Sequence, residues 1–310
     1  MNKYKKGLYY ISTDKYMKKF FLLTNIPSPY RIGLWKEISK YIDIEILYTD
    51  KTEKRRNWKI DFGEGYRYIL LNKIKLFNME FSLQLFKEIL NSKLIIIGGY
   101  GLPLMIQAIL FCKLIEKPYI LWSDGAITNH ENIILKYIKK FLIRGANKYI
   151  TTGIKGKEHL IYYGVKSERI SIIPLSIDVT YFHNQSLEYR KNKTKLKDKL
   201  QLKEYVILFI GRIVQEKGIF DLINVFKNIS NNRNDVSLLI IGNGKEEEKI
   251  KAIIENKKDI VYLGFVERDQ LPIYYSLSDI FILPTHYDPW GAVINEAMAC
   301  SLPVISTNMA

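Results

Sequence analysis

Short apolar segments recur along the chain and alternate with longer amphipathic ones. Their Ile, Val, Leu, Phe and Tyr residues follow one another without regular polar alternation, which is typical of strands buried on both faces of a parallel sheet. Amphipathic segments such as 220–229 and 246–254 have the period of helices that connect such strands. The pattern therefore predicts an α/β fold. Strands are expected at residues 20–23, 44–48, 94–97, 119–122, 170–174, 205–210, 238–241, 260–263, 280–283 and 302–305.

One charge-free segment, residues 94–112, has the nominal length of a membrane span. Residues 98–103 interrupt it with three glycines and Pro103, which suits the first turn of a helix. We interpret the segment as a buried strand followed by a helix, and we expect a soluble chain.

The length and composition indicate a folded protein of two domains. The chain has 310 residues, of which 47% are hydrophobic and 25% are charged. Residues 187–203 are polar and rich in lysine, and they are the best candidate for a linker. The predicted domains are therefore residues 1–186 and 204–310.

Charge is distributed unevenly between these parts. Residues 1–200 contain 36 Lys and Arg against 18 Asp and Glu, whereas residues 201–310 contain 11 against 14. A basic surface attracts nucleic acid, anionic lipid or phosphorylated substrates without distinguishing them. A solvated lysine-rich surface is the simplest interpretation. A nucleic-acid-binding protein is the alternative, although the sequence has no recognisable nucleic-acid-binding motif.

Cysteine and histidine are scarce. Cys112 and Cys300 lie far apart, and no two of the four histidines have metal-ligand spacing. We therefore expect no metal ion, no other cofactor and no disulfide framework, and a reducing, cytoplasmic compartment.

A possible anion site follows the predicted strand 205–210. Gly211 and Arg212 end this strand, and Lys217 and Gly218 precede an amphipathic helix. Backbone N–H groups at a helix start, together with two cations, would bind phosphate. Taken alone, a tight turn with two exposed basic side chains explains the same residues. The later turn 242–244, Gly-Asn-Gly, lacks a full dinucleotide-binding fingerprint and is better explained as a plain turn.

A second candidate follows the predicted strand 280–283. Asp288 lies on a loop, a helix begins near Gly291, and Glu296 lies more than one turn into that helix. Ligands of open α/β sheets bind across the carboxyl ends of the strands, where this loop is expected. A helix-capping aspartate is the simpler alternative.

In this order, the motifs resemble family-4 (group 1) retaining glycosyltransferases. The resemblance is nearly continuous over residues 205–306 and weaker at 27–31 and 149–178. It rests on Gly211-Arg212…Lys217-Gly218, Gly242-Asn243-Gly244, Leu263-Gly264-Phe265-Val266, Asp288…Glu296 and the following residues 297–305.

The resemblance implies the GT-B fold, with two Rossmann-like lobes facing a cleft. Residues 1–186 would bind the acceptor, and residues 204–310 would bind a nucleotide-sugar, with UDP as the expected nucleotide. Transfer would retain the anomeric configuration and need no metal. The acceptor would be a cell-surface glycan or a polyprenyl-linked carrier, and the basic first half would suit the inner, anionic face of a membrane.

The resemblance also implies roles for individual residues. Arg212 and Lys217 would stabilise the leaving diphosphate, Asp288 would orient the sugar, and Glu296 would bind the ribose. The other donor-binding positions would be Gly211, Phe265, Val266, Gly291 and Ala292, and Tyr30 and Arg31 would lie on the acceptor side.

Some positions depart from the family pattern. Asp288 and Ser301 stand where the family usually has Glu and Gly, and Ser301 is expected to adopt a positive φ. Asp124 stands near the position of a family histidine and is expected to contact the sugar. The chain also ends earlier than family members, so we expect a C-terminally incomplete donor lobe. An inactive truncated product and a same-fold epimerase are the further alternatives.

Overall fold

The computed structural model describes residues 19–52, 62–76, 79–125, 131–288 and 290–309. It divides into two compact units, Met1–Pro174 and Leu175–Ala310, which are described separately below. None of the helices within these described ranges has the length and apolar character needed to cross a membrane.

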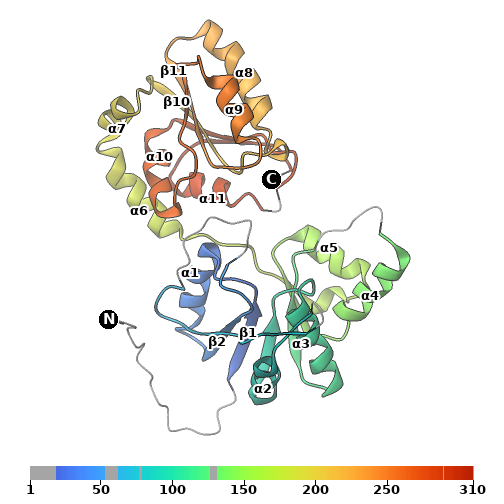
Figure 1. Cartoon of the computed structure of the whole chain (residues 1–310). Coiled ribbons are helices and arrows are strands. Elements are labelled where there is room, and N and C mark those ends of the chain that lie inside the picture. Colours follow the sequence, from blue (N-terminus) through green and yellow to red (C-terminus); the bar gives the residue numbers. More distant parts are fainter. Residues whose placement is uncertain (1–18, 53–61, 77–78, 126–130, 289, 310) are drawn as a thin grey trace. The chain divides into compact units, whose positions relative to one another are not determined.

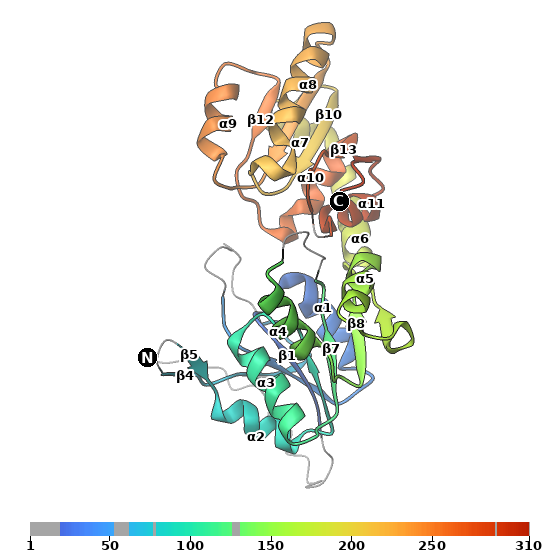
Figure 2. The same cartoon turned by 90° about the vertical axis from the view of Figure 1, so that its right-hand side faces the viewer.

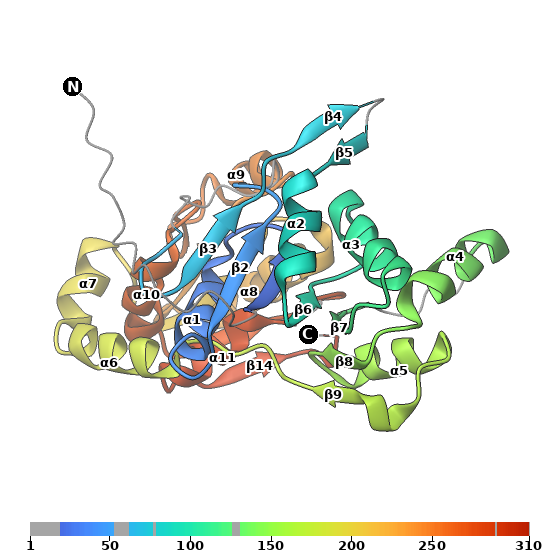
Figure 3. The ribbon, with the colours of Figure 1, turned by 90° about the horizontal axis from the view of Figure 1, so that it is seen from below.

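Unit 1 contains a seven-stranded parallel sheet with the order β3-β2-β1-β6-β7-β8-β9 (Figure 3). Its strands are β1 (Phe20–Thr24), β2 (Ile44–Tyr48), β3 (Arg67–Leu70), β6 (Leu94–Ile97), β7 (Tyr119–Trp122), β8 (Lys148–Thr151) and β9 (Ile170–Ile172). Its helices are α1 (Pro29–Ile38), α2 (Leu83–Asn91), α3 (Pro103–Leu114), α4 (Ile133–Ile143), α5 (Ile154–Tyr162) and the 3₁₀ turn η1 (Ser167–Arg169). A short antiparallel ribbon of β4 (Ile74–Leu76) and β5 (Met79–Phe81) extends from the sheet.

Unit 2 contains a five-stranded parallel sheet with the order β12-β11-β10-β13-β14 (Figures 1 and 2). Its strands are β10 (Tyr205–Ile210), β11 (Val236–Ile241), β12 (Ile260–Tyr262), β13 (Ile280–Leu283) and β14 (Val304–Ser306). Its helices are α6 (Val179–Arg190), α7 (Lys193–Lys199), α8 (Ile219–Asn232), α9 (Glu247–Ile254), α10 (Leu271–Leu277) and α11 (Ala292–Ala299). The 3₁₀ turns η2 (Gln215–Lys217) and η3 (Arg268–Gln270) complete it.

Both sheets have the strand order of a doubly wound fold. In unit 1 the order reverses between β1 and β6, and in unit 2 it reverses between β10 and β13. Ligands of such sheets bind outside the carboxyl ends of the strands at this switch point. The topology therefore directs attention to the loops after β1 and β6 and to those after β10 and β13.

All ten predicted strands are present, with ends that differ by up to two residues. Residues 94–112 form β6 followed by α3, with Pro103 in the first turn of the helix, as predicted. The pattern missed β3, β4, β5 and β8. β3 is an edge strand with Arg67 and Tyr68 exposed, so it lacks the continuous apolar signal of a central strand.

The structure places the boundary between the units after Pro174, earlier than the linker predicted at residues 187–203. That segment forms the end of α6 and all of α7, and both helices contact α10 of unit 2. The polar composition of this segment did not indicate that it packs on unit 2, because charged side chains make part of the contacts. Lys193 and Lys197 both bind Asp279, with N–O distances of 2.6 and 3.0 Å.

Candidate active site

The loops that follow the strands of unit 2 pack closely together. The N–H of Gly211 donates to the carbonyl of Ile241, and the N–H of Gly242 donates to the carbonyl of Gly264 at 2.8 Å. Gly242 has a φ of +138°, and a Cβ atom there would lie 1.8 Å from the carbonyl oxygen of Gly211. The turn 242–244 therefore supports the loop after β10 structurally, in agreement with its interpretation as a turn.

The loop after β10 is joined to the loop after β13. The carbonyl of Glu216 accepts hydrogen bonds from the Thr285 hydroxyl at 2.9 Å and from the His286 N–H at 2.8 Å. Gly218 has a φ of +68°, and a Cβ atom there would lie 1.9 Å from the carbonyl oxygen of Pro284. Only glycine fits this contact, which fixes the two predicted motifs against each other.

Lys217 is a buried member of this junction. Its side chain is almost fully covered, and Nζ lies 2.5 Å from Oδ2 of Asp288. Nζ also donates to the carbonyl of Tyr287 at 2.9 Å. The structure thus brings together two predicted residues from separate motifs. The role of Lys217 in binding a diphosphate stays a prediction.

Asp288 binds the start of helix α11 as well as Lys217. Its Oδ1 accepts hydrogen bonds from the N–H groups of Trp290 at 3.0 Å and Gly291 at 2.8 Å. Burial acts to raise the pKa of Asp288, but the Lys217 ammonium and these two amides outweigh it and hold the pKa below its usual value. Asp288 is therefore an ionised carboxylate that holds the turn leading into α11, and its contact with a sugar stays a prediction.

Arg212 has a different environment from Lys217. It lies at the carboxyl end of β10 with its side chain exposed to solvent. Within the described part of the chain it forms no ion pair. A guanidinium presented in this way at a switch point can bind a phosphate from solution.

The other predicted donor-binding positions surround the same edge of the sheet. Phe265 and Val266 follow β12, and Phe265 is 38% exposed. Gly291, with a φ of +65°, and Ala292 begin α11. These positions follow β12 and β13, which lie on either side of the central strands β11 and β10 in the same sheet.

Glu296 is fully buried and has partners that the sequence did not indicate. Its Oε1 accepts from Nε of Arg268 at 3.1 Å, and its Oε2 accepts from the Tyr275 hydroxyl at 3.1 Å. Burial raises the pKa of Glu296, and the two partners oppose that shift. The predicted ribose contact stays a prediction. Arg268 and Tyr275 lie 28 and 21 positions away, so no local pattern could have paired them with Glu296.

Two predicted residues of unit 1 also meet. The Arg31 guanidinium lies 3.3 Å from the Asp124 carboxylate and 4.9 Å from the centre of the Trp122 ring. Asp124 also accepts a hydrogen bond from the Thr152 N–H at 2.9 Å. Burial lowers the pKa of Arg31, and Asp124 opposes that shift. Tyr30 lies half-buried beside Arg31 in the first turn of α1.

A cavity of about 410 Å³ lies at the switch point of unit 1. It opens between the loops after β1 and β6, where the topology predicts a ligand site. Its lining residues are Thr24, Asn25, Ile26, Ser28, Arg31, Gly98, Gly99, Gly101, Leu102 and Met105.

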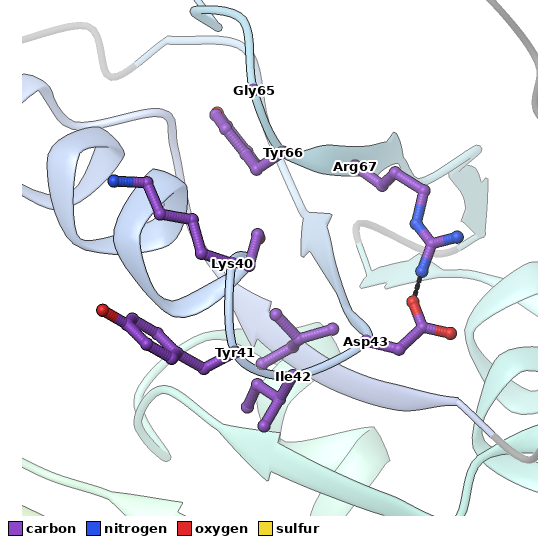
Figure 4. Close-up of a pocket in the computed structure, with 9 residues that line it drawn as sticks. Lys40, Tyr41, Ile42, Asp43, Gly65, Tyr66 and Arg67 are labelled. Atoms are coloured by element: carbon purple, nitrogen blue, oxygen red, sulfur yellow. Dashed lines mark ion pairs between the residues drawn. The ribbon is translucent and has the colours of Figure 1, made fainter.

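A larger cavity of about 540 Å³ lies at the opposite ends of the strands (Figure 4). Residues 39–44, between α1 and β2, and residues 65–67 line it, and Arg67 forms an ion pair with Asp43 there. None of the predicted site residues borders it. Its position at the amino ends of β2 and β3 makes it the weaker candidate, despite its size.

No three His, Cys, Asp or Glu side chains in the described ranges are grouped so that they could hold a metal ion. Charged groups at this edge of the unit 2 sheet include the Arg212 guanidinium, the Glu216 carboxylate and the Lys217–Asp288 pair.

Comparison with known proteins shows which family residues 191–310 resemble and which fold the chain shares. Residues 191–310 match the family model of glycosyl transferases group 1. The structure resembles HepE of Anabaena, solved with UDP and glucose, with a TM-score of 0.68 at 15% identity over 95% of this chain and 82% of HepE. The fold is GT-B, as the resemblance implied.

Some curated relatives are more similar in sequence. The chain is 32% identical to the alpha-monoglucosyldiacylglycerol synthase of Acholeplasma laidlawii over 44% of its own length and 35% of the synthase. It is 33% identical to the capsular polysaccharide biosynthesis glycosyltransferase CapM of Staphylococcus aureus, over 39% of this chain and 33% of CapM. The matches thus span about a third of these relatives. The likeness to the group 1 glycosyltransferase family is thus shown for residues 191–310.

Proposed function

We propose that this chain is part of a retaining glycosyltransferase that uses a nucleotide-diphospho-sugar, with a UDP-sugar as the proposed donor. The observation that carries the proposal is the exposed Arg212 at the carboxyl end of β10, beside the buried Lys217–Asp288 pair. This position is the switch point of a group 1 glycosyltransferase domain. HepE, which has a similar fold, was solved with UDP and with UDP-glucose.

The charges at this site suit the departure of a nucleoside diphosphate. When the sugar–phosphate bond breaks, negative charge grows on the leaving oxygen. A cation fixed near that oxygen stabilises the transition state more than the ground state. Arg212 would bind the diphosphate in a fork, and Lys217 would contribute a charge held in place by Asp288. No divalent metal would be required.

The remaining assignments complete the donor site. Asp288 would orient the sugar, Glu296 would bind the ribose through its remaining lone pairs, and Phe265 and Val266 would border the base. Gly211, Gly291 and Ala292 would allow the donor to approach the backbone closely. These roles rest on the matching motif positions and on their location at one edge of one sheet.

The acceptor would bind in unit 1, at the cavity beside Arg31, Tyr30 and Asp124. A cell-surface glycan or a lipid-linked glycan is the proposed class, because the relatives include a diacylglycerol glucosylation enzyme and a capsular polysaccharide enzyme by name. Either acceptor would place the protein on the cytoplasmic face of a membrane as a peripheral protein.

The first prediction tests the diphosphate site by calorimetric titration with UDP. Arg212→Ala should weaken UDP binding about ten-fold or more, because a charge-assisted bond contributes roughly 1.5–3 kcal/mol. Arg233→Ala is the matched control, since Arg233 is an exposed arginine of the same unit that pairs with Asp235. Equal UDP affinity in the wild type and in a folded Arg212→Ala protein would refute the site. Salt-sensitive binding of unrelated DNA without UDP binding would favour the nucleic-acid alternative.

A further inference from the structure

Helix α4 of unit 1 exposes its apolar face to solvent. Six of its large apolar side chains are between 46% and 67% exposed, and only Leu142 and Ile143 are buried. The exposed residues are Ile133, Ile134, Leu135, Tyr137, Ile138 and Phe141. Isolated exposed apolar residues are ordinary, but a continuous apolar face of this kind marks an interaction surface.

The arrangement on α4 is the reverse of that on an ordinary surface helix. Ile134, Ile138 and Phe141 follow helical spacing and form the centre of the exposed face. Lys136 and Lys139 are half-buried on the side that faces the unit. Lys139 forms an ion pair with Glu131, and Nζ of Lys136 lies 4.3 Å from the centre of the Tyr162 ring.

Basic groups border this apolar face. Residues 132–144 contain no acidic residue, and besides the engaged Lys136 and Lys139 they contain the half-buried Lys140 and the exposed Arg144. Nζ of Lys113, on the neighbouring helix α3, lies 4.1 Å from the centre of the Phe141 ring. The Glu131 carboxylate is already engaged by Lys139 and by the Tyr163 hydroxyl at 2.5 Å. The charge around α4 is therefore complementary to an anionic partner.

From this combination we infer that α4 docks unit 1 onto an anionic lipid surface, with its apolar face in the interface. Eleven residues of helix extend about 16 Å, roughly half the thickness of a membrane core, so α4 lies in the interface and does not span it. Lysine and arginine beside inserted apolar side chains bind lipid phosphates, and this pairing favours a lipid surface over an uncharged protein partner.

The position of α4 in the fold agrees with such a role. The chain leaves the carboxyl end of β7, where Asp124 lies, and α4 is the next helix. α4 lies at the outer edge of unit 1, beside α5 (Figures 1 and 3). Docking through α4 would bring this edge of the sheet to the membrane. The inference rests on the proposed acceptor only for its biological purpose, since lipid binding can be measured without any acceptor.

The test is co-sedimentation with vesicles of equal parts phosphatidylglycerol and phosphatidylcholine, and with vesicles of phosphatidylcholine alone. The wild type should bind the anionic vesicles, and Ile134→Ser/Phe141→Ser should bind them at least ten-fold more weakly. Leu83→Ser/Leu90→Ser, on α2 of the same unit, is the matched control, since both leucines are more than half exposed. Equal binding by the wild type and the α4 variant would overturn the inference.

A labelling measurement keeps the test valid if the double variant is unstable. Ile134→Cys can be labelled with an environment-sensitive dye, because both native cysteines are buried. The dye fluorescence should shift to the blue with anionic vesicles but not with phosphatidylcholine vesicles, and a dye at Leu83→Cys should not shift. An absent shift at residue 134 would contradict insertion of α4.

Two further readouts separate the alternatives. Analytical ultracentrifugation without lipid tests for a dimer. If a dimer forms and the α4 variant abolishes it while vesicle binding persists, the apolar face of α4 binds a second copy of the chain and the inference is overturned. UDP titration of the same preparations tests the donor site independently. Intact UDP binding with no vesicle binding would overturn the docking role of α4 alone, whereas vesicle binding without UDP binding would overturn the proposed function alone.

Discussion

At the scale of single residues, Lys217 and Asp288 show how unit 2 holds its site together. Each is the main partner of the other, and both are largely removed from water. Removing one member of a buried ion pair leaves an uncompensated charge, which usually costs more than the pair itself contributes. The pair therefore stabilises the loops that it joins, and substitution of either residue alone is expected to be costly.

We predict that Asp288→Asn lowers the free energy of unfolding at pH 7 by about 2–3 kcal/mol, because it leaves Lys217 buried without a counterion. The pKa of Asp288 is lowered in the folded chain, so its stabilising effect is complete above the ordinary aspartate pKa of about 3.9. That effect is lost as the pH falls through the lowered value. Urea unfolding at pH 7 and at pH 3 should therefore show a difference between wild type and variant that shrinks in acid.

Asp198→Asn is the control for this experiment, since Asp198 is an exposed aspartate on α7 of the same unit. It should leave the free energy of unfolding nearly unchanged at either pH. A cost for Asp288→Asn that stays constant between pH 7 and pH 3 would argue against the ion pair as its cause.

Ser301 provides a second residue-scale prediction. It follows α11 with a φ of +53°. This left-handed conformation is the one predicted from the glycine that the resembled family usually has at this position. A non-glycine residue pays roughly 1–2 kcal/mol there, partly offset by the greater unfolded-state entropy of glycine. Ser301→Gly should therefore raise the free energy of unfolding by about 1 kcal/mol in urea denaturation. Ser301→Ala, which keeps the Cβ atom, should not raise it.

At the scale of elements, steric constraints explain the glycines of the two loops. Gly218 and Gly264 share a positive φ, near +68° and +71°. A Cβ atom at Gly218 would collide with the Pro284 carbonyl, whereas a Cβ atom at Gly264 meets nothing within 4 Å. The two positions therefore separate backbone strain from steric collision in a single protein.

We predict that Gly264→Ala costs about 1–2 kcal/mol of unfolding free energy, the usual penalty of a left-handed residue with a side chain. Gly218→Ala should cost several kcal/mol or prevent unit 2 from folding, because the loops after β10 and β13 would have to separate. Urea denaturation followed by circular dichroism measures both variants. Similar costs for the two would mean that the loops can separate at little expense.

The elements also show what a pattern of apolar residues can predict. Central strands are covered on both faces, so their apolar residues are continuous, and all ten predicted strands exist. The boundary at residues 187–203 was misplaced because α6 and α7 join unit 2 through Phe182, which lies outside that range, and through lysines bound to Asp279. Contacts of this kind depend on residues distant in sequence, such as the carboxylate 82 positions from Lys197.

At the scale of the whole molecule, the two units share one topological feature, a reversal of strand order at which a ligand site is expected. Each sheet reverses its strand order once, and each reversal lies beside predicted site residues, Arg31 in unit 1 and Arg212 in unit 2. Motif order predicted this placement, because residues directly after parallel strands must meet at one edge. The order of the motifs could not predict which side chains bind the Glu296 and Asp288 carboxylates, since those partners come from other elements.

The last prediction concerns divalent metal. A metal ion in a glycosyl transfer neutralises the diphosphate and stabilises the leaving group. Under the proposed function, the exposed Arg212 of unit 2 would supply this charge from the chain itself. We therefore expect the dissociation constant for UDP to agree within about two-fold in excess EDTA and in millimolar Mg²⁺, whereas Arg212→Ala should weaken binding in both. Calorimetric titration under the two conditions measures this directly. If wild-type UDP binding requires Mg²⁺ or Mn²⁺, then a metal ion and not Arg212 neutralises the diphosphate, and the assignment of Arg212 is wrong.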